Sequence, residues 1–280
     1  MKKCITIRLL PTRIISNLIF TMILILFAIC YFFPLLWLFL TSFKDPALIG
    51  TGKFFFTPSL YNYKIIFTNW NIMLYFKNSV IVSVLSTLIA LTVGSLGAYS
   101  LVRLNPPNKD FLAFEILSLR GIPPVVAVIP IFILVNKFQI QGSLFTLTII
   151  YAVMNLPFVI WLIAGFIKEI PLSVEESALI DGCTRFEIFR KICFPLIVPG
   201  VVSTGILSLI FAWNEFLFAN ILMSKDAKTL PVIAAMAVKE YSIAWGPACA
   251  AGVVCIFPII FLGIIVQKYL VRGFSFGAIK

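Results

Sequence analysis

Few side chains in this sequence could carry out chemistry. The 280 residues include 11 acidic residues and no histidine. The two neighbouring carboxylates of Glu175 and Glu176 are a candidate acid–base pair, but glycoside hydrolysis needs carboxylates that face each other across a sugar, and adjacent helical residues point to different faces. The six cysteines have no Cys-x-x-Cys spacing and no histidine to join them, so we expect neither a metal site nor a disulfide framework. The sequence therefore predicts a protein that is not an enzyme.

The charged side chains are concentrated in one stretch, Ser173–Pro195, of a chain that is 61% hydrophobic and 12% charged. A hydroxyl residue followed three positions later by glutamate occurs twice, in Ser173–Glu176 and in Thr184–Glu187, and predicts a capping box at the start of each of two short helices. Gly182 lies between them and suits the left-handed conformation that ends a helix. Physical reasoning leaves two interpretations open: an amphipathic hairpin lying at a membrane surface, or an element that docks a soluble partner.

Composition indicates an integral membrane protein, because the mean hydropathy is +1.08 and soluble domains are usually about 45–50% apolar. We expect one domain over residues 1–280 with six spans, each longer than the roughly 20 residues that cross a bilayer. The first apolar run exceeds the 7–15-residue core of a signal peptide, so it is expected to be an uncleaved anchor. Pro123 and Pro124 should bend or interrupt the third span. The predicted spans are 14–40, 76–101, 111–135, 143–167, 196–223 and 248–270, with a polar loop at 168–195.

The arginines outside the spans predict the orientation. They fall in the N-terminus, the second-to-third loop, the fourth-to-fifth loop and the C-terminus, so the positive-inside rule places both termini and the loop 168–195 in the cytoplasm. This topology accounts for the net charge of +11 without a nucleic-acid partner. No GxxxxGK[ST] phosphate-binding loop is present in the sequence, so any ATP-driven role requires an ATPase on another chain.

Five polar or aromatic residues within the predicted spans are candidates for a solute path: Arg120, Asn155, Trp213, Asn214 and Glu215. Ionisable groups inside a membrane are costly and usually functional. Aromatic faces with amide and carboxylate groups would suit a sugar. An alternative is that the charged residues form clamps between helices, and that Asn155 satisfies backbone groups freed by Pro157. Both interpretations remain open.

The polar loop resembles the EAA loop of ABC importer permeases. The pattern of that loop is Glu-Ala-Ala, then three residues, then Gly, then nine residues, then Ile-x-Leu-Pro. This spacing is matched here by Glu176–Ala178, Gly182 and Ile192–Pro195. Ser177 replaces the first alanine of the pattern, and Phe194 replaces the leucine. Other stretches resemble the carbohydrate-uptake branch: Asn78–Ser79, Arg120–Pro124, Asn155–Phe158, Ala212–Phe216 and Gln267–Gly277. The chain is most similar to the second, six-span permease subunit of maltose-type importers.

This resemblance implies an all-α membrane protein with the six-helix type I ABC importer fold and a cytoplasmic coupling loop. It implies a permease subunit of an ATP-driven, binding-protein-dependent sugar importer that forms half of the translocation path. The partners would be a second homologous permease, two ATP-binding subunits and an extracytoplasmic solute-binding protein. ATP and Mg would be used by the ATPase, with no cofactor bound by this chain. The alternatives are an importer of another solute such as glycerol phosphate, for which Arg120 offers a positive charge, and a self-contained secondary transporter.

The resemblance also implies roles for particular residues. Tyr241, Trp245 and Gly246 would meet the binding protein. In maltose systems the partner permease makes most sugar contacts, which weakens the case for the tripeptide at 213–215 as a sugar site. The residues expected to couple to the ATPase are Glu175, Glu176, Ser177, Ala178, Asp181, Gly182, Arg185, Ile192, Phe194 and Pro195.

Overall fold

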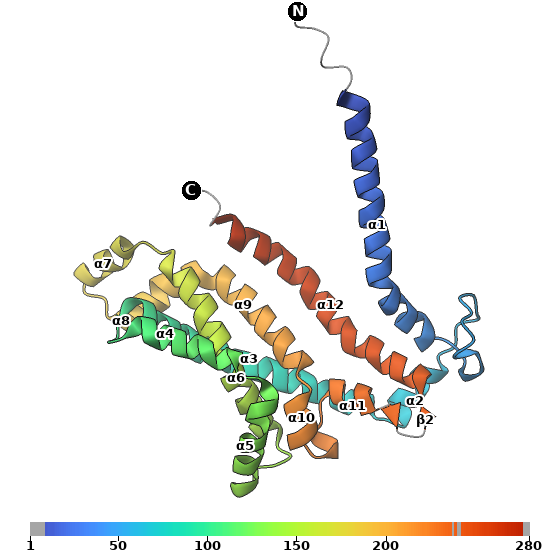
Figure 1. The fold of residues 1–280 in the computed structure, drawn as a ribbon. Coiled ribbons are helices and arrows are strands. Elements are labelled where there is room, and N and C mark those ends of the chain that lie inside the picture. Colours follow the sequence, from blue (N-terminus) through green and yellow to red (C-terminus); the bar gives the residue numbers. More distant parts are fainter. Residues whose placement is uncertain (1–8, 237, 240–241, 277–280) are drawn as a thin grey trace, which may run out of the picture.

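The computed structural model describes the backbone of residues 9–236, 238–239 and 242–276, and the side chains of 17–236 and 244–267. Five of the helices in this part are long and apolar enough to cross a membrane, and a bent helix pair would make a sixth span. The chain is therefore a multi-pass membrane protein. The long helices are α1 (Leu9–Ser42), α3 (Ile72–Arg103), α6 (Leu144–Lys168), α9 (Phe194–Asn214) and α12 (Trp245–Phe276) (Figure 1).

The core of the molecule lies where α3, α6 and α9 pack together. Helix α3 approaches α6 closely at Gly94, where a Cβ atom would lie 2.6 Å from Cγ1 of Val159. Small residues allow such close approach between membrane helices, where dispersion contacts replace the hydrophobic effect as the driving force. Ala90, Ala98 and Ile163 are fully buried around this contact. The three helices therefore form a closely packed frame for the segments at their ends.

The third predicted span is interrupted, as the two prolines predict. Helix α4 (Lys109–Ser118) and the short 3₁₀ turn η2 (Leu119–Gly121) end before Pro123, and α5 (Pro124–Lys137) continues at an angle of 91°. Proline disfavours the helical conformation in the residue before it and is tolerated at the start of a helix, which explains the break at this position. Helix α4 buries no residue against the rest of the described structure.

The fifth predicted span, 196–223, differs from the structure at both ends. The helical segment begins earlier, at α8 (Arg185–Ile188), and continues through the π-helical η3 (Phe189–Cys193) into α9. It ends at Asn214, because Glu215 adopts an extended backbone and its carboxylate accepts hydrogen bonds from the N–H groups of Phe218 (3.0 Å) and Ala219 (3.3 Å). The carboxylate thus starts a new helix, α10 (Leu217–Leu222).

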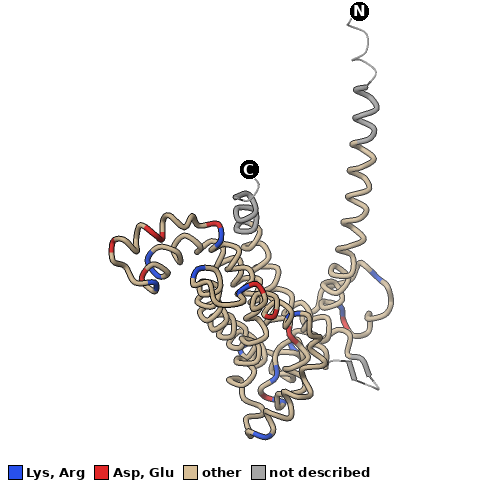
Figure 2. Tube along the Cα trace, turned by 60° about the vertical axis from the view of Figure 1, so that its left-hand side comes forward, with Lys and Arg blue, Asp and Glu red and all other residues tan. Residues whose placement is uncertain are grey.

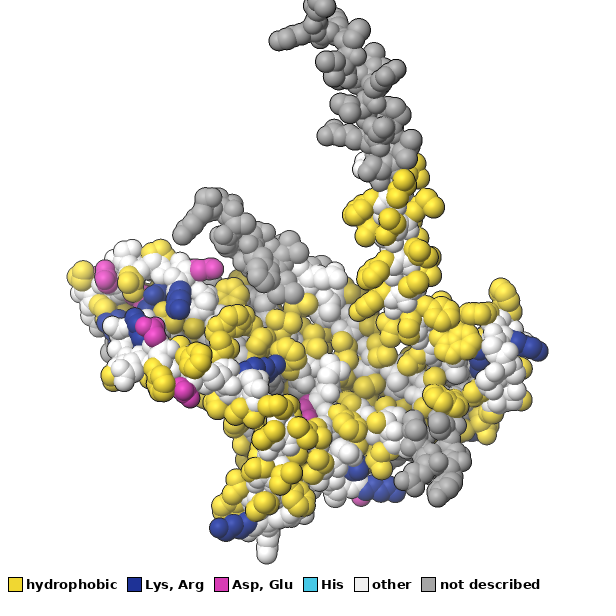
Figure 3. Space-filling view, viewed as in Figure 1, with side chains coloured by type: hydrophobic (Ala, Val, Ile, Leu, Met, Phe, Trp, Pro, Cys, Tyr) yellow, Lys and Arg dark blue, Asp and Glu magenta, His cyan; other side chains and the backbone are white. Residues whose placement is uncertain are grey.

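The remaining elements gather at two opposite ends of the frame. Helices α7 (Leu172–Ile180) and α8 lie at one end, and a two-stranded antiparallel ribbon at the other end is a small departure from the expected all-α fold. Charged residues cluster around α7 and α8 and are sparse along the spans (Figure 2), whereas hydrophobic side chains cover much of the visible surface (Figure 3). The elements at the opposite end are η1 (Pro46–Leu48), α2 (Tyr61–Thr68), η4 (Lys225–Ala227), α11 (Leu230–Met236), β1 (Val238–Lys239) and β2 (Ser242–Ile243).

Candidate functional site

The turn between α7 and α8 favours a glycine. Gly182 has φ +83°, a backbone conformation that costs residues with a Cβ about 1–2 kcal/mol. Its N–H donates to the carbonyl of Leu179 at 3.1 Å, and the N–H of Cys183 donates to the carbonyl of Ala178 at 3.0 Å. These two bonds satisfy carbonyls that the end of α7 would otherwise leave unpaired. The predicted role of Gly182 in ending the first helix is therefore confirmed.

One of the two predicted capping boxes is present. The Thr184 hydroxyl accepts from the N–H of Glu187 at 3.3 Å, and the Glu187 carboxylate accepts from the N–H of Thr184 at 3.0 Å. The box predicted at Ser173 is wrong, because α7 begins at Leu172, directly after Pro171, two residues earlier than a cap at Ser173 would place it. Ser173 therefore lies inside the first turn, where its carbonyl accepts from the Ser177 hydroxyl at 2.8 Å.

Glu175 forms a buried network with α3 that we call the Arg103–Glu175 clamp. The Arg103 Nε lies 2.5 Å from a Glu175 carboxylate oxygen, and the two side chains are 6% and 1% exposed. The Tyr99 hydroxyl donates to the other carboxylate oxygen at 3.2 Å. Arg103 Nη2 donates to the carbonyls of Ile167 (2.8 Å) and Ile170 (2.7 Å) at the end of α6. The clamp therefore ties α7 to two of the three frame helices.

The outer face of the α7–α8 loop combines charged and apolar side chains. Glu176, Asp181 and Arg185 are exposed, and Ile180 is 87% exposed. An exposed apolar patch rimmed by polar residues is typical of a surface that binds another protein. Of the other residues predicted for coupling, Ala178 is buried, Ile192 is half-buried, and Ser177, Gly182, Phe194 and Pro195 are exposed.

Three of the five residues predicted for a solute path line one cavity of about 420 Å³ at the α4–α5 break: Arg120, Asn155 and Glu215. The Arg120 guanidinium lies 5.1 Å from the ring centroid of Phe158 and 4.5 Å from that of Phe211. Both distances are within the range in which an aromatic face attracts a cation. The Nη1 atom is 3.5 Å from the side-chain oxygen of Asn155.

Glu215 both lines this cavity and links helices. Its carboxylate accepts a short hydrogen bond from the hydroxyl of Tyr151, on α6, in addition to the two N–H groups of α10. The two interpretations of this residue, path and clamp, are therefore compatible in one geometry. The Glu215 carboxylate already accepts three hydrogen bonds, so it has little capacity left to accept one from a solute. The Arg120 guanidinium lines the same cavity and has five N–H donors.

Trp213 and Asn214 do not line the cavity that holds Arg120. The Trp213 indole N–H donates to the carbonyl of Cys255 on α12 at 3.1 Å, and its ring packs at 5.7 Å from that of Phe76. Asn214 donates to the carbonyl of Ile210, one turn back on its own helix, at 2.9 Å. Consecutive helical residues point in different directions, so adjacency in the sequence did not bring these side chains to one site.

The residues predicted to contact a binding protein occupy different environments. Trp245 is exposed at the start of α12, and Gly246 is buried. A Cβ atom at Gly246 would overlap the side chain of Asn62, whose amide donates to the carbonyls of Ser42 and Lys44. Gly246 therefore serves close packing between α12 and α2. Tyr241 lies outside the described residues.

The architecture is that of an ABC importer permease. The fold matches a bacterial ABC transporter involved in the import of the acidic polysaccharide alginate, with a TM-score of 0.78 at 23% identity, covering 92% of this chain and 97% of that one. Residues 90–276 match the family described as the inner membrane component of binding-protein-dependent transport systems. The chain belongs to this family, which confirms the resemblance found in the sequence.

Relatives with assigned transport systems cover nearly the whole chain. The sulfoquinovosyl glycerol transport system permease protein SmoH of Agrobacterium fabrum is 34% identical over 252 residues, which are 89% of this chain and 88% of that protein. The trehalose/maltose transport system permease protein MalG of Thermococcus litoralis is 32% identical over 262 residues, 91% and 94% of the two chains. The similarity therefore extends well beyond the loop motif.

Proposed function

We propose that this chain is a permease subunit of an ATP-driven sugar importer and forms half of its translocation path. The observation that carries the proposal is the α7–α8 loop, which exposes charged and apolar side chains on its outer face and is joined to the frame helices by the buried Arg103–Glu175 clamp. A soluble motor bound to this face could move the spans through the clamp. Both termini and the loop lie in the cytoplasm in this proposal, because the arginines follow the positive-inside rule.

The assembly contains a second homologous permease, two ATP-binding subunits and an extracytoplasmic solute-binding protein. The ATP-binding subunits dock on the loop 168–195 and use ATP and Mg, and the chain itself carries no cofactor. The outer end, with Trp245 exposed at the start of α12, faces the binding protein. Membership of a binding-protein-dependent transport family supports this composition.

A sugar is the proposed solute class for two reasons. Relatives at 31–34% identity carry names that refer to trehalose, maltose, diacetylchitobiose and sulfoquinovosyl glycerol. The cavity at the α4–α5 break also combines the exposed ring of Phe211 with the polar side chains of Arg120 and Asn155. Aromatic faces can stack on the apolar faces of a sugar, while polar groups bond its hydroxyls.

The docking face can be tested with Ile180→Asp, which places a charge on the most exposed apolar side chain of the loop. Truncating a hot-spot residue near the centre of an interface costs about 2 kcal/mol or more. With Ile180 in that role, we expect the ATP-binding subunits to dissociate at least about thirtyfold more readily. The measurement is their co-isolation with the tagged permease. Ile140→Asp is the matched control, because Ile140 is also exposed and follows α5 at the opposite end. Equal co-isolation of both variants would contradict the assigned docking face.

A further inference from the structure

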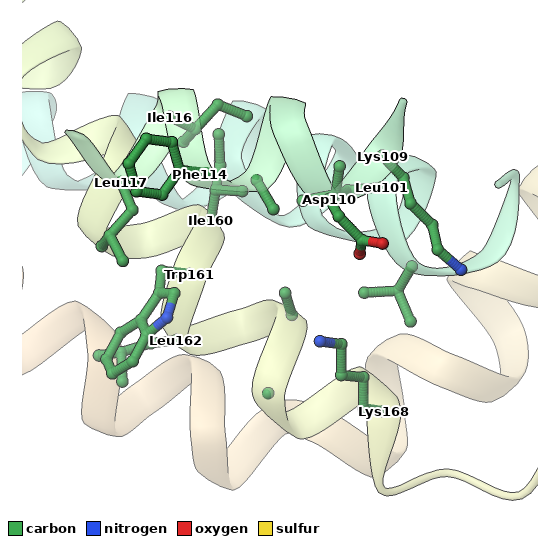
Figure 4. A pocket seen from close by; sticks show the side chains of 14 residues that line it. Leu101, Lys109, Asp110, Phe114, Ile116, Leu117, Ile160, Trp161, Leu162 and Lys168 are labelled. Atoms are coloured by element: carbon green, nitrogen blue, oxygen red, sulfur yellow. The ribbon is translucent and has the colours of Figure 1, made fainter. Parts of the chain in front are cut away.

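We propose that a phospholipid with an anionic headgroup binds in a second cavity, formed between α4, α6 and the end of α3. This cavity has a volume of about 510 Å³. Its lining is asymmetric: Lys109, Asp110 and Lys168 lie at one end, and Phe114 and Trp161 lie toward the other (Figure 4). A charged mouth that leads into an apolar groove is complementary to a lipid headgroup and its acyl chain.

The apolar part of the cavity is not filled by protein. Helix α4 buries no residue, and Phe114 and Trp161 are 66% and 55% exposed. Gly165 forms part of the wall, and a Cβ atom at this position would meet nothing within 4 Å. In a membrane, an open apolar groove of this kind is solvated by hydrocarbon, and one acyl chain can lie along the glycine of α6.

The charged end favours an anionic headgroup. Lys109 begins α4 and Lys168 ends α6, so the two ammonium groups belong to the same end of the frame as the Arg103–Glu175 clamp. Among residues 17–236 and 244–267, no salt bridge involves Lys109, Lys168 or Asp110. Two lysines and one aspartate leave a net positive charge at the mouth. Basic pockets between helices on the cytoplasmic side are a recognised form of lipid-headgroup site.

The position in the bilayer rests on the proposed orientation, in which this end faces the cytoplasmic leaflet with its anionic lipids. A lipid phosphate held between Lys109 and Lys168 would connect α4 to α6, where the protein itself leaves a gap. It would thereby support the α4 side of the 91° break that borders the solute cavity. Each lysine near an anionic surface contributes about 1 kcal/mol, which corresponds to roughly fivefold in affinity.

Trp161 makes the site directly measurable in the intact transporter. The complex is reconstituted in phosphatidylcholine nanodiscs that contain brominated phosphatidylglycerol or brominated phosphatidylcholine, and the quenching due to Trp161 is taken as the difference from a Trp161→Phe complex. We expect the anionic lipid to quench this component with about tenfold or greater preference. Lys109→Gln combined with Lys168→Gln should remove the preference, whereas Lys137→Gln, at the opposite end, should retain it.

A second variant tests the acyl-chain groove. Gly165→Leu places a side chain in the open wall, where its Cβ would meet no atom within 4 Å, so it should reduce Trp161 quenching by either lipid. Gly263→Leu, at another position with an open Cβ site on α12, should not reduce it. Equal quenching by the two lipids, or a preference unchanged in the double lysine variant, would overturn the proposal. Absence of quenching by both lipids would overturn it as well, because the groove would then be covered by protein. None of these readouts depends on which solute is transported or on docking of the ATPase.

Discussion

Glu175→Gln should weaken the permease because it removes one charge from the Arg103–Glu175 clamp and keeps the shape of the side chain. Removing one partner of a buried ion pair costs about 3–5 kcal/mol, mainly because the remaining charge is left uncompensated. We expect the lower end, about 3 kcal/mol, because Arg103 keeps its bonds to the carbonyls of Ile167 and Ile170 and a glutamine oxygen can still accept from it. At about 2–4 °C per kcal/mol, the melting midpoint of the complex should fall by roughly 6–12 °C.

The sequence supplies a matched control. Glu176→Gln is the same substitution on the adjacent, exposed carboxylate, and exposed charges contribute little to stability. Melting is followed in the reconstituted complex, together with the number of solute molecules taken up per ATP hydrolysed. Glu175→Gln should lower that ratio, because α7 can then move without moving α3.

A double-mutant cycle separates the clamp from general damage. The double variant Arg103→Met with Glu175→Gln should lose less stability than the two single variants lose in sum, by about 0.5–3 kcal/mol. The reason is that the double variant leaves no unpaired buried charge. Two results would refute the assigned role of the clamp. One is an equal melting midpoint for the Glu175→Gln and Glu176→Gln complexes. The other is a double variant whose destabilisation equals the sum of those of the two single variants within about 0.5 kcal/mol.

Two further predictions concern the turn and the solute cavity. Gly182→Asn should retain transport while Gly182→Val loses most of it at equal membrane content, because asparagine tolerates the left-handed backbone and a β-branched residue does not; equal uptake by the two variants would contradict the assigned conformation. Arg120→Lys should raise the solute concentration for half-maximal uptake roughly fivefold, since lysine loses the stacking on Phe158 and Phe211 worth about 1 kcal/mol. The same variant should still co-isolate with the other subunits, and failed assembly would instead identify Arg120 as a clamp between helices.

Local signals in the sequence predicted the features that depend on neighbouring residues. The proline pair predicted the break between α4 and α5, and Thr184 and Glu187 predicted the cap of α8. The break at Glu215 carries no proline or glycine to mark it, because a side chain that caps the following helix causes it. The pattern at Ser173 was misleading because Pro171 had already set the start of α7.

Features that depend on distant parts of the chain could not be read from the sequence. Arg103 and Glu175 are 72 positions apart, and each has a simpler local explanation: Arg103 as a topological signal and Glu175 as a partner of the ATPase. The pairing emerges once α3 and α6 are seen side by side, with Gly94 setting their approach. The cavity that holds Arg120 and Asn155 likewise joins two spans, and only the packing of α6 against the α4–α5 break defines it.

The exposure of α1 has a consequence for the order in which the protein is built. The described residues bury none of the apolar window of this helix. Near its end the helix contacts α12, where a Cβ at Gly252 would lie 3.3 Å from Leu38. The ribosome makes α1 well before α12. Before α12 is made, the end of α1 can already be held by α2, whose Asn62 amide donates to the carbonyl of Ser42. The packing of α1 against α12 must therefore form later in assembly than its contact with α2.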